Sequence, residues 1–240
     1  MSIVDWHDVE CGGYAADLPL WRELARAEPG PVLDVGAGTG RVSLDLARAG
    51  HDVTALDVEP ALLAAAERRA RREGLPLTTV AADATGFDLG DRRFGLILVP
   101  MQTIQLLSGA TGRAGFLASA RRHLAPGGLL ALAIAEALES FEDELFGLPL
   151  PDVGERDGYR FFSHPVAVRE RGETVRLERV RRTISPDGAQ SAEGDVIELT
   201  RLTAAVLEAE GAAADLRPLP AHGVPATGAH VGATVVALRG

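Results

Sequence analysis

Three alternating glycines between an apolar run and a helical pattern constrain the fold of this chain most. Gly36, Gly38 and Gly40 follow the β-branched run at 32–35, and apolar residues at helical spacing begin at Val42. Glycine permits a tight turn and the close approach of a ligand to the backbone, and the helix behind it offers N-terminal NH groups. The segment therefore predicts a nucleotide-binding strand, loop and helix.

A second strand pattern supports this interpretation. The apolar run at 53–56 ends in Asp57, which stands 57 − 36 = 21 positions after the first glycine of the turn. A carboxylate at this place can accept hydrogen bonds from both ribose hydroxyls of an adenosine. The glycine spacing is GxGxG, whereas the dinucleotide fingerprint has its third glycine one place later. This spacing counts against an NAD-dependent oxidoreductase, which is kept as an alternative.

Five motifs in order carry a resemblance to a known family. They lie at 34–40, at Asp57, at Asp83-Ala84 after a third strand pattern, at 94–102, and at 124–130 with its Pro-Gly-Gly sequence. Residues 32–135 resemble the core of a class I S-adenosylmethionine-dependent methyltransferase of the small-molecule type. Gly95 departs from the pattern, because many members carry an acid there. The resemblance implies S-adenosyl-L-methionine as cofactor and in-line methyl transfer to a small-molecule nitrogen or oxygen acceptor.

The order of the patterns predicts the architecture. Strands that alternate with helices imply right-handed crossovers and a parallel sheet buried on both faces. We expect an α/β, Rossmann-like doubly wound sheet of seven strands, mostly parallel with the last strand antiparallel, plus an antiparallel β insertion. The expected parts are an N-terminal lid and helix at 1–30, the cofactor-binding core at 31–135, a lid and β insertion at 136–200, and a C-terminal helix and strands at 201–240.

Local patterns predict the bounds of individual elements. Helices are expected over Leu18–Ala27, from Val42 to near Gly50, over Pro60–Glu73, and at 202–210 with Gly211 as the stop. Strands are expected at 160–162, 166–168, 175–184, 196–199, 216–219 and 231–238, with a tight turn at 185–188. The segment 139–151 mixes apolar residues with acids and prolines, which suits a partly apolar lid. The insertion is expected to cover the active site or to make a dimer contact.

Ligands of open α/β sheets bind outside the carboxyl ends of the strands. This rule and the motifs predict the cofactor-binding residues, which are Tyr14, Asp34, Gly36, Ala37, Gly38, Thr39, Gly40, Asp57, Val58, Asp83, Ala84, Pro100, Met101, Gln102 and Gln105. Tyr14 belongs to a flexible segment that could close over the site. Asp34 has a second interpretation, in which it binds the NH groups of its own glycine loop. For Gln102 and Gln105, helix capping or packing also remains open.

No catalytic residue is assigned from the sequence, because methyl transfer can depend mainly on alignment and desolvation. An amine acceptor needs no strong base, whereas a hydroxyl acceptor makes a histidine base more important. The candidates on the ligand side are His164, His222 and His230. His51 and His123 precede strands and are expected at the opposite end of the sheet. No metal site is expected, because no cluster has metal-ligand spacing.

Composition limits the partners. Lys+Arg 24 against Asp+Glu 34 gives a net charge of −10, which argues against a nucleic-acid footprint. No run approaches the ~18 apolar residues of a membrane span, and no signal peptide is visible. Cys11 is the only cysteine, so we expect a cytoplasmic protein without disulfides. A homodimer and a non-catalytic protein that binds S-adenosylmethionine remain open.

Overall fold

The computed structural model describes residues 2–136, 141–142, 150–227 and 230–240. Its core is a seven-stranded sheet with the order β11-β12-β5-β4-β1-β2-β3. The parallel strands are β1 (Val32–Val35), β2 (Val53–Asp57), β3 (Thr78–Ala81), β4 (Phe94–Val99) and β5 (Leu124–Ile134). β12 (Ala233–Arg239) runs antiparallel to both β5 and β11 (Arg217–Val224). The predicted α/β fold with an antiparallel last strand is confirmed.

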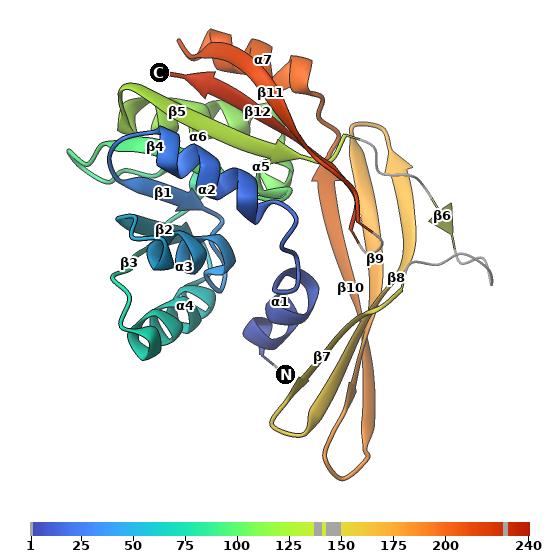
Figure 1. Ribbon diagram of the computed structural model, residues 1–240. Coiled ribbons are helices and arrows are strands. Elements are labelled where there is room, and N and C mark those ends of the chain that lie inside the picture. Colours follow the sequence, from blue (N-terminus) through green and yellow to red (C-terminus); the bar gives the residue numbers. More distant parts are fainter. Residues whose placement is uncertain (1, 137–140, 143–149, 228–229) are drawn as a thin grey trace.

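Helices cover both faces of this sheet (Figure 1). They are α2 (Leu18–Ala27), α3 (Arg41–Arg48), α4 (Pro60–Glu73), α5 (Thr103–Leu106), α6 (Gly109–His123) and α7 (Ala204–Ala213), with a short 3-10 turn η1 (Ala84–Gly86). Trp21 of α2 belongs to one buried cluster and Phe116 of α6 to the other. Leu96 and Ile97 of β4 belong to different clusters, because successive side chains of a strand point to opposite faces.

Two local predictions need correction. Gly211 does not end a helix at 210, because α7 continues to Ala213. A Cβ at Gly211 would lie 2.6 Å from Cδ1 of Leu238, so the absent side chain allows α7 to pack on β12. The Pro-Gly-Gly sequence does not precede the fifth strand, because β5 already begins at Leu124 and contains it. The predicted helices Leu18–Ala27 and Pro60–Glu73 are confirmed with these bounds.

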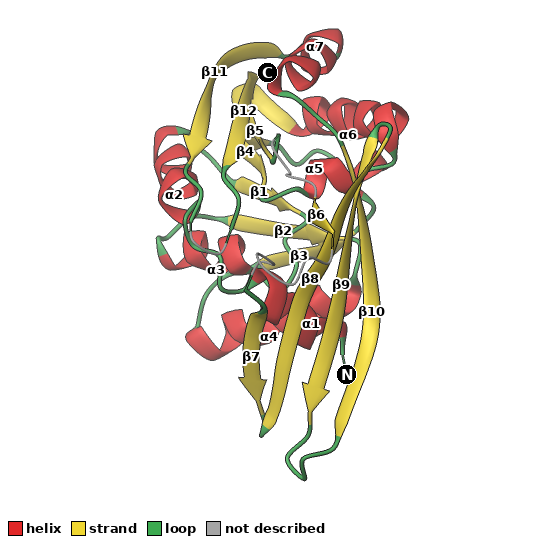
Figure 2. Cartoon of the chain, turned by 90° about the vertical axis from the view of Figure 1, so that its right-hand side faces the viewer, coloured by secondary structure: helices red, strands yellow, loops and turns green. Residues whose placement is uncertain are grey.

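The insertion forms a second, antiparallel sheet beside the core (Figures 1 and 2). Its order is β10-β9-β8-β6, and β7 also pairs with β8. The strands are β6 (Phe141–Glu142), β7 (Asp152–Arg156), β8 (Tyr159–Arg171), β9 (Thr174–Ile184) and β10 (Gln190–Thr200). The two short strands expected at 160–162 and 166–168 are one strand, β8. Residues 139–140 and 143–149, most of the expected apolar lid, lie outside the described residues.

The helix α1 (Ile3–Cys11) is absent from the sequence prediction, and it joins the two sheets (Figure 1). Ser2 and Asp5 cap its N-terminus through reciprocal hydrogen bonds. On the core side, Val4 packs in a cluster with Leu62 of α4. On the other side, the ring of Trp6 meets Phe161 of β8 edge-on at 5.4 Å. None of the described helices has the length and apolar character that a bilayer span requires.

Candidate functional site

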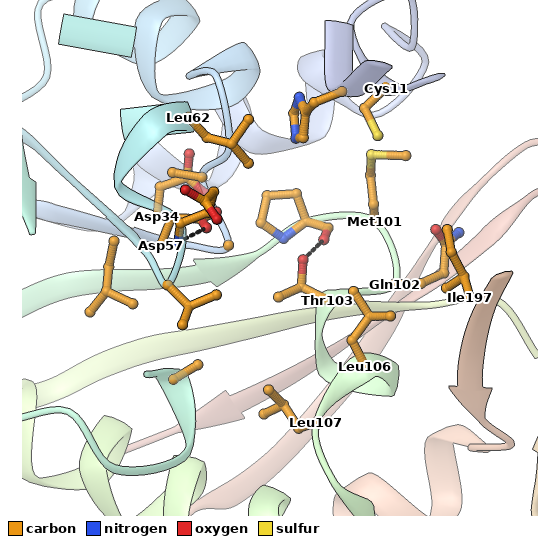
Figure 3. Close-up of a pocket in the computed structure, with 18 of the residues that line it drawn as sticks. Cys11, Asp34, Asp57, Leu62, Met101, Gln102, Thr103, Leu106, Leu107 and Ile197 are labelled. Carbon is orange, nitrogen blue, oxygen red and sulfur yellow. Dashed lines mark hydrogen bonds between the residues drawn. The ribbon is translucent and has the colours of Figure 1, made fainter. Parts of the chain in front are cut away.

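A cavity of about 600 Å³ opens where the carboxyl ends of β1, β2 and β4 meet α1 and the antiparallel sheet (Figure 3). A volume of this size is typical of sites for small molecules and cofactors. In Figure 3, Asp34 and Asp57 lie on one side of the cavity, and Met101, Gln102 and Ile197 lie on the other. We call the first side the glycine-loop end and the second the sheet end.

Most of the predicted cofactor-binding residues line this cavity. They are Asp34, Gly36, Ala37, Asp57, Val58, Asp83, Ala84, Pro100, Met101 and Gln102. These residues come from four separate parts of the core, and the parallel sheet brings them together because its strands end at one edge. The sheet therefore assembles one site from motifs that are up to 68 positions apart in the sequence (102 − 34 = 68).

The glycine loop is held close to its neighbours by backbone conformations that favour glycine. Gly36 has φ +73°, and a Cβ there would lie 2.4 Å from Cγ2 of Thr103. The amide of Gly38 donates to Oδ2 of Asp57 at 2.8 Å, and the amide of Glu59 donates to Oδ1 at 2.9 Å. These two bonds fix the Asp57 carboxylate at the cavity wall. Each of its oxygens keeps a lone pair for a ligand hydroxyl.

Asp34 is fully buried at the glycine-loop end and is only half satisfied. Its Oδ2 accepts a hydrogen bond from Oγ of Ser43 at 2.5 Å, while Oδ1 has no partner among the described residues. Burial raises the pKa of Asp34 to about 6, although the hydrogen bond from Ser43 acts against this rise. The interpretation that Asp34 binds its own glycine loop is wrong, because neither of its oxygens accepts from an amide of that loop. The amide of Gly38 donates to Asp57 instead. A buried acceptor without a partner indicates a missing donor or cation.

Two further positions shape the cavity wall. Oδ1 of Asp83 accepts hydrogen bonds from the amide and the hydroxyl of Thr85, both at 2.8 Å, and these bonds lower the pKa of this exposed carboxyl. Met101 follows β4 with φ +55°, a left-handed backbone conformation that is unfavourable for a methionine. Such outliers cost about 1–3 kcal/mol and gather at functional sites.

Five of the predicted cofactor-binding residues do not line the cavity. They are Tyr14, Gly38, Thr39, Gly40 and Gln105. Tyr14 is buried against the His230 ring at 4.9 Å, under the guanidinium of Arg41. The amide of Gln105 is used by the protein itself, since it donates to the carbonyls of Ala135 and Thr200 and accepts from the Ala135 amide. Packing, the other interpretation of Gln105, agrees with these bonds.

The three histidines expected near the ligand also lie away from the cavity wall. His164 is a residue of β8 and His230 packs on Tyr14. His222 lies within β11, and so does not follow that strand as the sequence suggested. His123 is buried on the opposite side as expected, where it accepts from the Leu89 amide at 3.1 Å. None of His164, His222 and His230 is therefore placed to act on a ligand in this cavity.

Sequence reasoning missed the walls that α1 and the antiparallel sheet contribute. They are His7, Glu10 and Cys11 from α1, with Leu177, Arg179, Ile197 and Leu199 from β9 and β10. Glu10 binds the Arg181 guanidinium through both carboxylate oxygens, at 2.7 and 2.8 Å, and accepts from Ser163 at 2.6 Å. Burial alone would raise the pKa of Glu10, but these bonds bring it below its ordinary value. The Ser2-x-x-Asp5 pattern was the available signal for α1.

Comparison with known proteins agrees with this geometry. Residues 32–128 match the family model described as "Methyltransferase domain". This segment is a methyltransferase domain. A demethylmenaquinone methyltransferase of Tropheryma whipplei (strain Twist) is 38% identical over 101 residues, which are 41% of this chain and 39% of that protein. The chain thus spans about two fifths of the length of this curated relative.

Solved structures match this chain over nearly its whole length. The sugar N-methyltransferase KedS8 from Streptoalloteichus sp ATCC 53650 is 26% identical with a TM-score of 0.75, covering 98% of this chain and 92% of that one. CalS10, an amino pentose methyltransferase from Micromonospora echinaspora solved with bound SAM, is 25% identical with a TM-score of 0.69, covering 100% and 98%. The CcbJ methyltransferase from Streptomyces caelestis, at 20% identity and a TM-score of 0.73, shares the fold. Both the KedS8 and the CalS10 alignments extend over the antiparallel sheet of this chain, and S-adenosylmethionine is the cofactor of this class.

Proposed function

We propose that this protein transfers a methyl group from S-adenosylmethionine to an amine of a small molecule. The observation that carries the proposal is one cavity that is lined by residues of both the glycine-loop end and the sheet end. A methyl donor and a methyl acceptor must meet in line, and one cavity with two chemically different ends allows this. Holding the reactants in that geometry can supply about 7–11 kcal/mol of the barrier.

The residues of the glycine-loop end fit the cofactor. Gly36 lets the Thr103 side chain pack against the glycine loop, and Asp57 presents a fixed carboxylate to the ribose hydroxyls. The unpaired Oδ1 of Asp34 suits the cofactor amine, and Asp83 with Ala84 borders the place expected for the adenine. When bound, the cofactor supplies an activated methyl group on a sulfonium. The chain's own residues then orient the reactants and exclude water.

The sheet end suits a small acceptor with an apolar side and a few polar groups. Leu177, Ile197 and Leu199 form an apolar wall, and the Gln102 amide has no hydrogen-bond partner among the described residues. Nε of Arg179 is buried without a partner among them, while Nη1 binds Asp152 at 2.9 Å. The similarity to KedS8, a sugar N-methyltransferase, and to CalS10, an amino pentose methyltransferase, supports an amine on a sugar-like molecule. The β insertion is proposed to cap this acceptor.

Turnover of a panel of amines tests the proposal. The full chain is incubated with S-adenosylmethionine and amino sugars, ethanolamine or matched phenols, and S-adenosylhomocysteine is quantified. We expect product with at least one amine, loss of turnover in Asp57→Ala, and normal turnover in Asp91→Ala, which changes an exposed carboxyl outside the cavity. Cofactor binding without turnover of any acceptor would favour a non-catalytic binding protein, and binding of NAD alone would favour an oxidoreductase.

Two finer expectations belong to this proposal. A cytoplasmic location is supported by the single cysteine, which leaves the chain without an intrachain disulfide, as is usual for proteins of that compartment. Self-association is supported by the long unpaired side of β10 in the described sheet, since exposed strand edges pair readily. Sedimentation equilibrium of the full chain distinguishes one copy from two.

A further inference from the structure

The cationic side chains of the cavity limit which acceptors it can hold, and this inference rests on the proposed function. Among the described residues, Arg41 and Arg179 are the only arginines or lysines that line the cavity. Arg41 binds both oxygens of Asp17, at 2.6 and 2.8 Å, and Arg179 binds Asp152 at 2.9 Å. The residues outside the described ranges include no Lys or Arg. Each guanidinium of the described cavity wall therefore already holds a carboxylate.

Arg179 lies at the sheet end of the cavity. Leu177 of β9 pairs in register with Ile197 of β10, and Figure 3 shows Ile197 beside Gln102, on the side of the cavity opposite Asp57. Side chains two positions apart on a strand share one face, so Arg179 points to the same side of the sheet as Leu177. Both residues line the cavity. The guanidinium therefore adjoins the apolar wall against which an acceptor would lie.

The nitrogens of Arg179 are used unequally. Nη1 donates to Asp152 at 2.9 Å and to Oγ of Ser163 at 3.3 Å, and Nε is fully buried. Nη2 has no hydrogen-bond partner among the described residues and, unlike Nε, is not fully buried. A carboxylate or phosphate is bound most strongly by two parallel N–H bonds from one guanidinium. Arg179 has one nitrogen left, so it can donate to a single oxygen but cannot form this fork.

The charges behind the wall give no surplus of positive charge. Arg181 binds Glu10 through two bonds, at 2.7 and 2.8 Å, and Asp195 at 2.7 Å. Together with the pair of Arg179 and Asp152, three carboxylates surround two guanidiniums. An anionic group of an acceptor would be repelled by these carboxylates, whereas its amine, as a cation, would be attracted.

Gln102 supplies the second polar contact of the sheet end. Its side-chain amide has no hydrogen-bond partner among the described residues, and it lies beside Ile197 in Figure 3. An amide both donates and accepts, which matches a hydroxyl group and needs no charge on the ligand. The neighbouring Leu177 and Leu199 offer apolar surface. A sugar ring or another polyol fits this pattern, because it has C–H faces and hydroxyl edges.

We propose that the acceptor is a hydroxylated amine without a phosphate or carboxylate group, and that Arg179 and Gln102 are the residues that select it. Nη2 of Arg179 donates to one oxygen of the acceptor, and the Gln102 amide exchanges a hydrogen bond with another. The apolar wall packs against the C–H face. An amine joined to a nucleoside diphosphate is excluded as the acceptor, because Arg41 and Arg179 already hold carboxylates.

Matched amines test the acceptor class on the wild-type full chain. Ethanolamine is compared with O-phosphoethanolamine, and glucosamine with glucosamine 6-phosphate, by release of S-adenosylhomocysteine. Each pair keeps the amine and adds a phosphate. We expect kcat/KM for an ester to lie at least about tenfold below that of its parent. Equal or faster turnover of an ester, or turnover of amines without hydroxyls alone, would overturn the inference and leave the proposed function standing. The proposed function itself fails if wild type methylates no amine.

Substitutions test the role of the two residues with the better of the two hydroxylated amines. In Arg179→Met, kcat/KM should fall about 10- to 100-fold through a higher KM, because a hydrogen bond from a charged donor is lost. In Gln102→Leu the fall should be about two- to tenfold, because the lost bond is between neutral groups. The carbon analogue, cyclohexylamine for glucosamine or propylamine for ethanolamine, should bind wild type and both variants equally well, as substrate or as inhibitor.

Two controls separate this role from an effect on folding. Asp152→Asn combined with Arg179→Met removes both charges of the ion pair, and it should show the same loss with an affinity for S-adenosylhomocysteine that equals wild type. Arg182→Met changes an exposed arginine that points to the opposite face of β9, and it should leave both amines unaffected. An equal loss for the hydroxylated amine and its carbon analogue, or no loss for either, would refute the role of Arg179.

Discussion

The buried carboxyl of Asp34 makes a prediction that links stability to the site. Its Oδ1 has no partner among the described residues, and burial raises its pKa to about 6 from the ordinary 3.8. A charge without a full set of partners in the interior destabilises the folded state. Asp34→Asn removes this charge and keeps an oxygen that can accept from Ser43. The substitution should therefore improve stability at neutral pH while it removes a group that we propose binds the cofactor.

The size of the effect follows from the two pKa values. The folded protein binds the Asp34 proton more tightly than the unfolded chain, so the wild-type stability falls as pH rises from about 4 to about 6. A pKa difference of about 2 lowers the free energy of unfolding of wild type by about 3 kcal/mol at pH values above that window. About 1 kcal/mol of this loss has already occurred at pH 4.5. The free energy of unfolding of Asp34→Asn, relative to wild type, should thus gain about 2 kcal/mol between pH 4.5 and 7.5.

Urea unfolding at these two pH values measures this gain. Any constant difference in hydrogen bonding cancels, because only the change with pH is compared. Asp91→Asn, at an exposed position, is the matched control. The same Asp34→Asn protein should bind S-adenosylmethionine at least tenfold more weakly at pH 7.5. A stability difference that does not change with pH, or a change of the opposite sign, would refute the assignment of a strained carboxylate at Asp34.

Three further substitutions test separate parts of the structure. Gly36→Ala places a Cβ 2.4 Å from the Thr103 side chain at φ +73°, which distorts the glycine loop. Calorimetry should show at least tenfold weaker S-adenosylhomocysteine binding. Unchanged affinity would contradict the role of the glycine loop in cofactor binding. Gln105→Leu leaves buried backbone groups of Ala135 and Thr200 unpaired, and each unpaired group costs about 1–3 kcal/mol. Urea unfolding should show this loss of stability, while the folded protein keeps its affinity for the cofactor. Weaker cofactor binding would show that Gln105 is a ligand after all. Glu10→Gln removes the carboxylate that pairs with Arg181 and should lower the free energy of unfolding by about 3 kcal/mol. Proteolysis near α1 should also become faster. Wild-type stability would show that this ion pair does not hold the helix.

The core of the site was predictable because its signals are local. A glycine turn and a strand that ends in an acid each occupy a few neighbouring residues, and the parallel sheet then places Asp34, Asp57 and Asp83 at one edge. Helix ends such as Gly74, with φ +67°, were also readable, because glycine favours this conformation after a helix. Gly211 misled for the opposite reason, since its small size serves packing against Leu238.

The sheet end was not predictable from local pattern. His7 and Arg179 are separated by more than half of the chain, and both line the cavity because α1 packs between α4 and the antiparallel sheet. The sequence at 3–11 does not show which side chain faces a ligand. In the folded protein Trp6 packs on Phe161, His7 contacts Thr39 and Glu10 binds Arg181, and all three partners are distant in the sequence. Gln105 shows the same limit, because its bonds reach the backbone 30 and 95 positions away.

Titration calorimetry of the full chain with S-adenosylmethionine, S-adenosylhomocysteine and NAD tests the central claim most directly. The account predicts one site for each sulfur ligand, clear weakening of both in Asp57→Ala, and no binding of NAD. Binding of NAD alone, or of none of the three ligands, would contradict the assignment of the glycine-loop end as a cofactor site for methyl transfer.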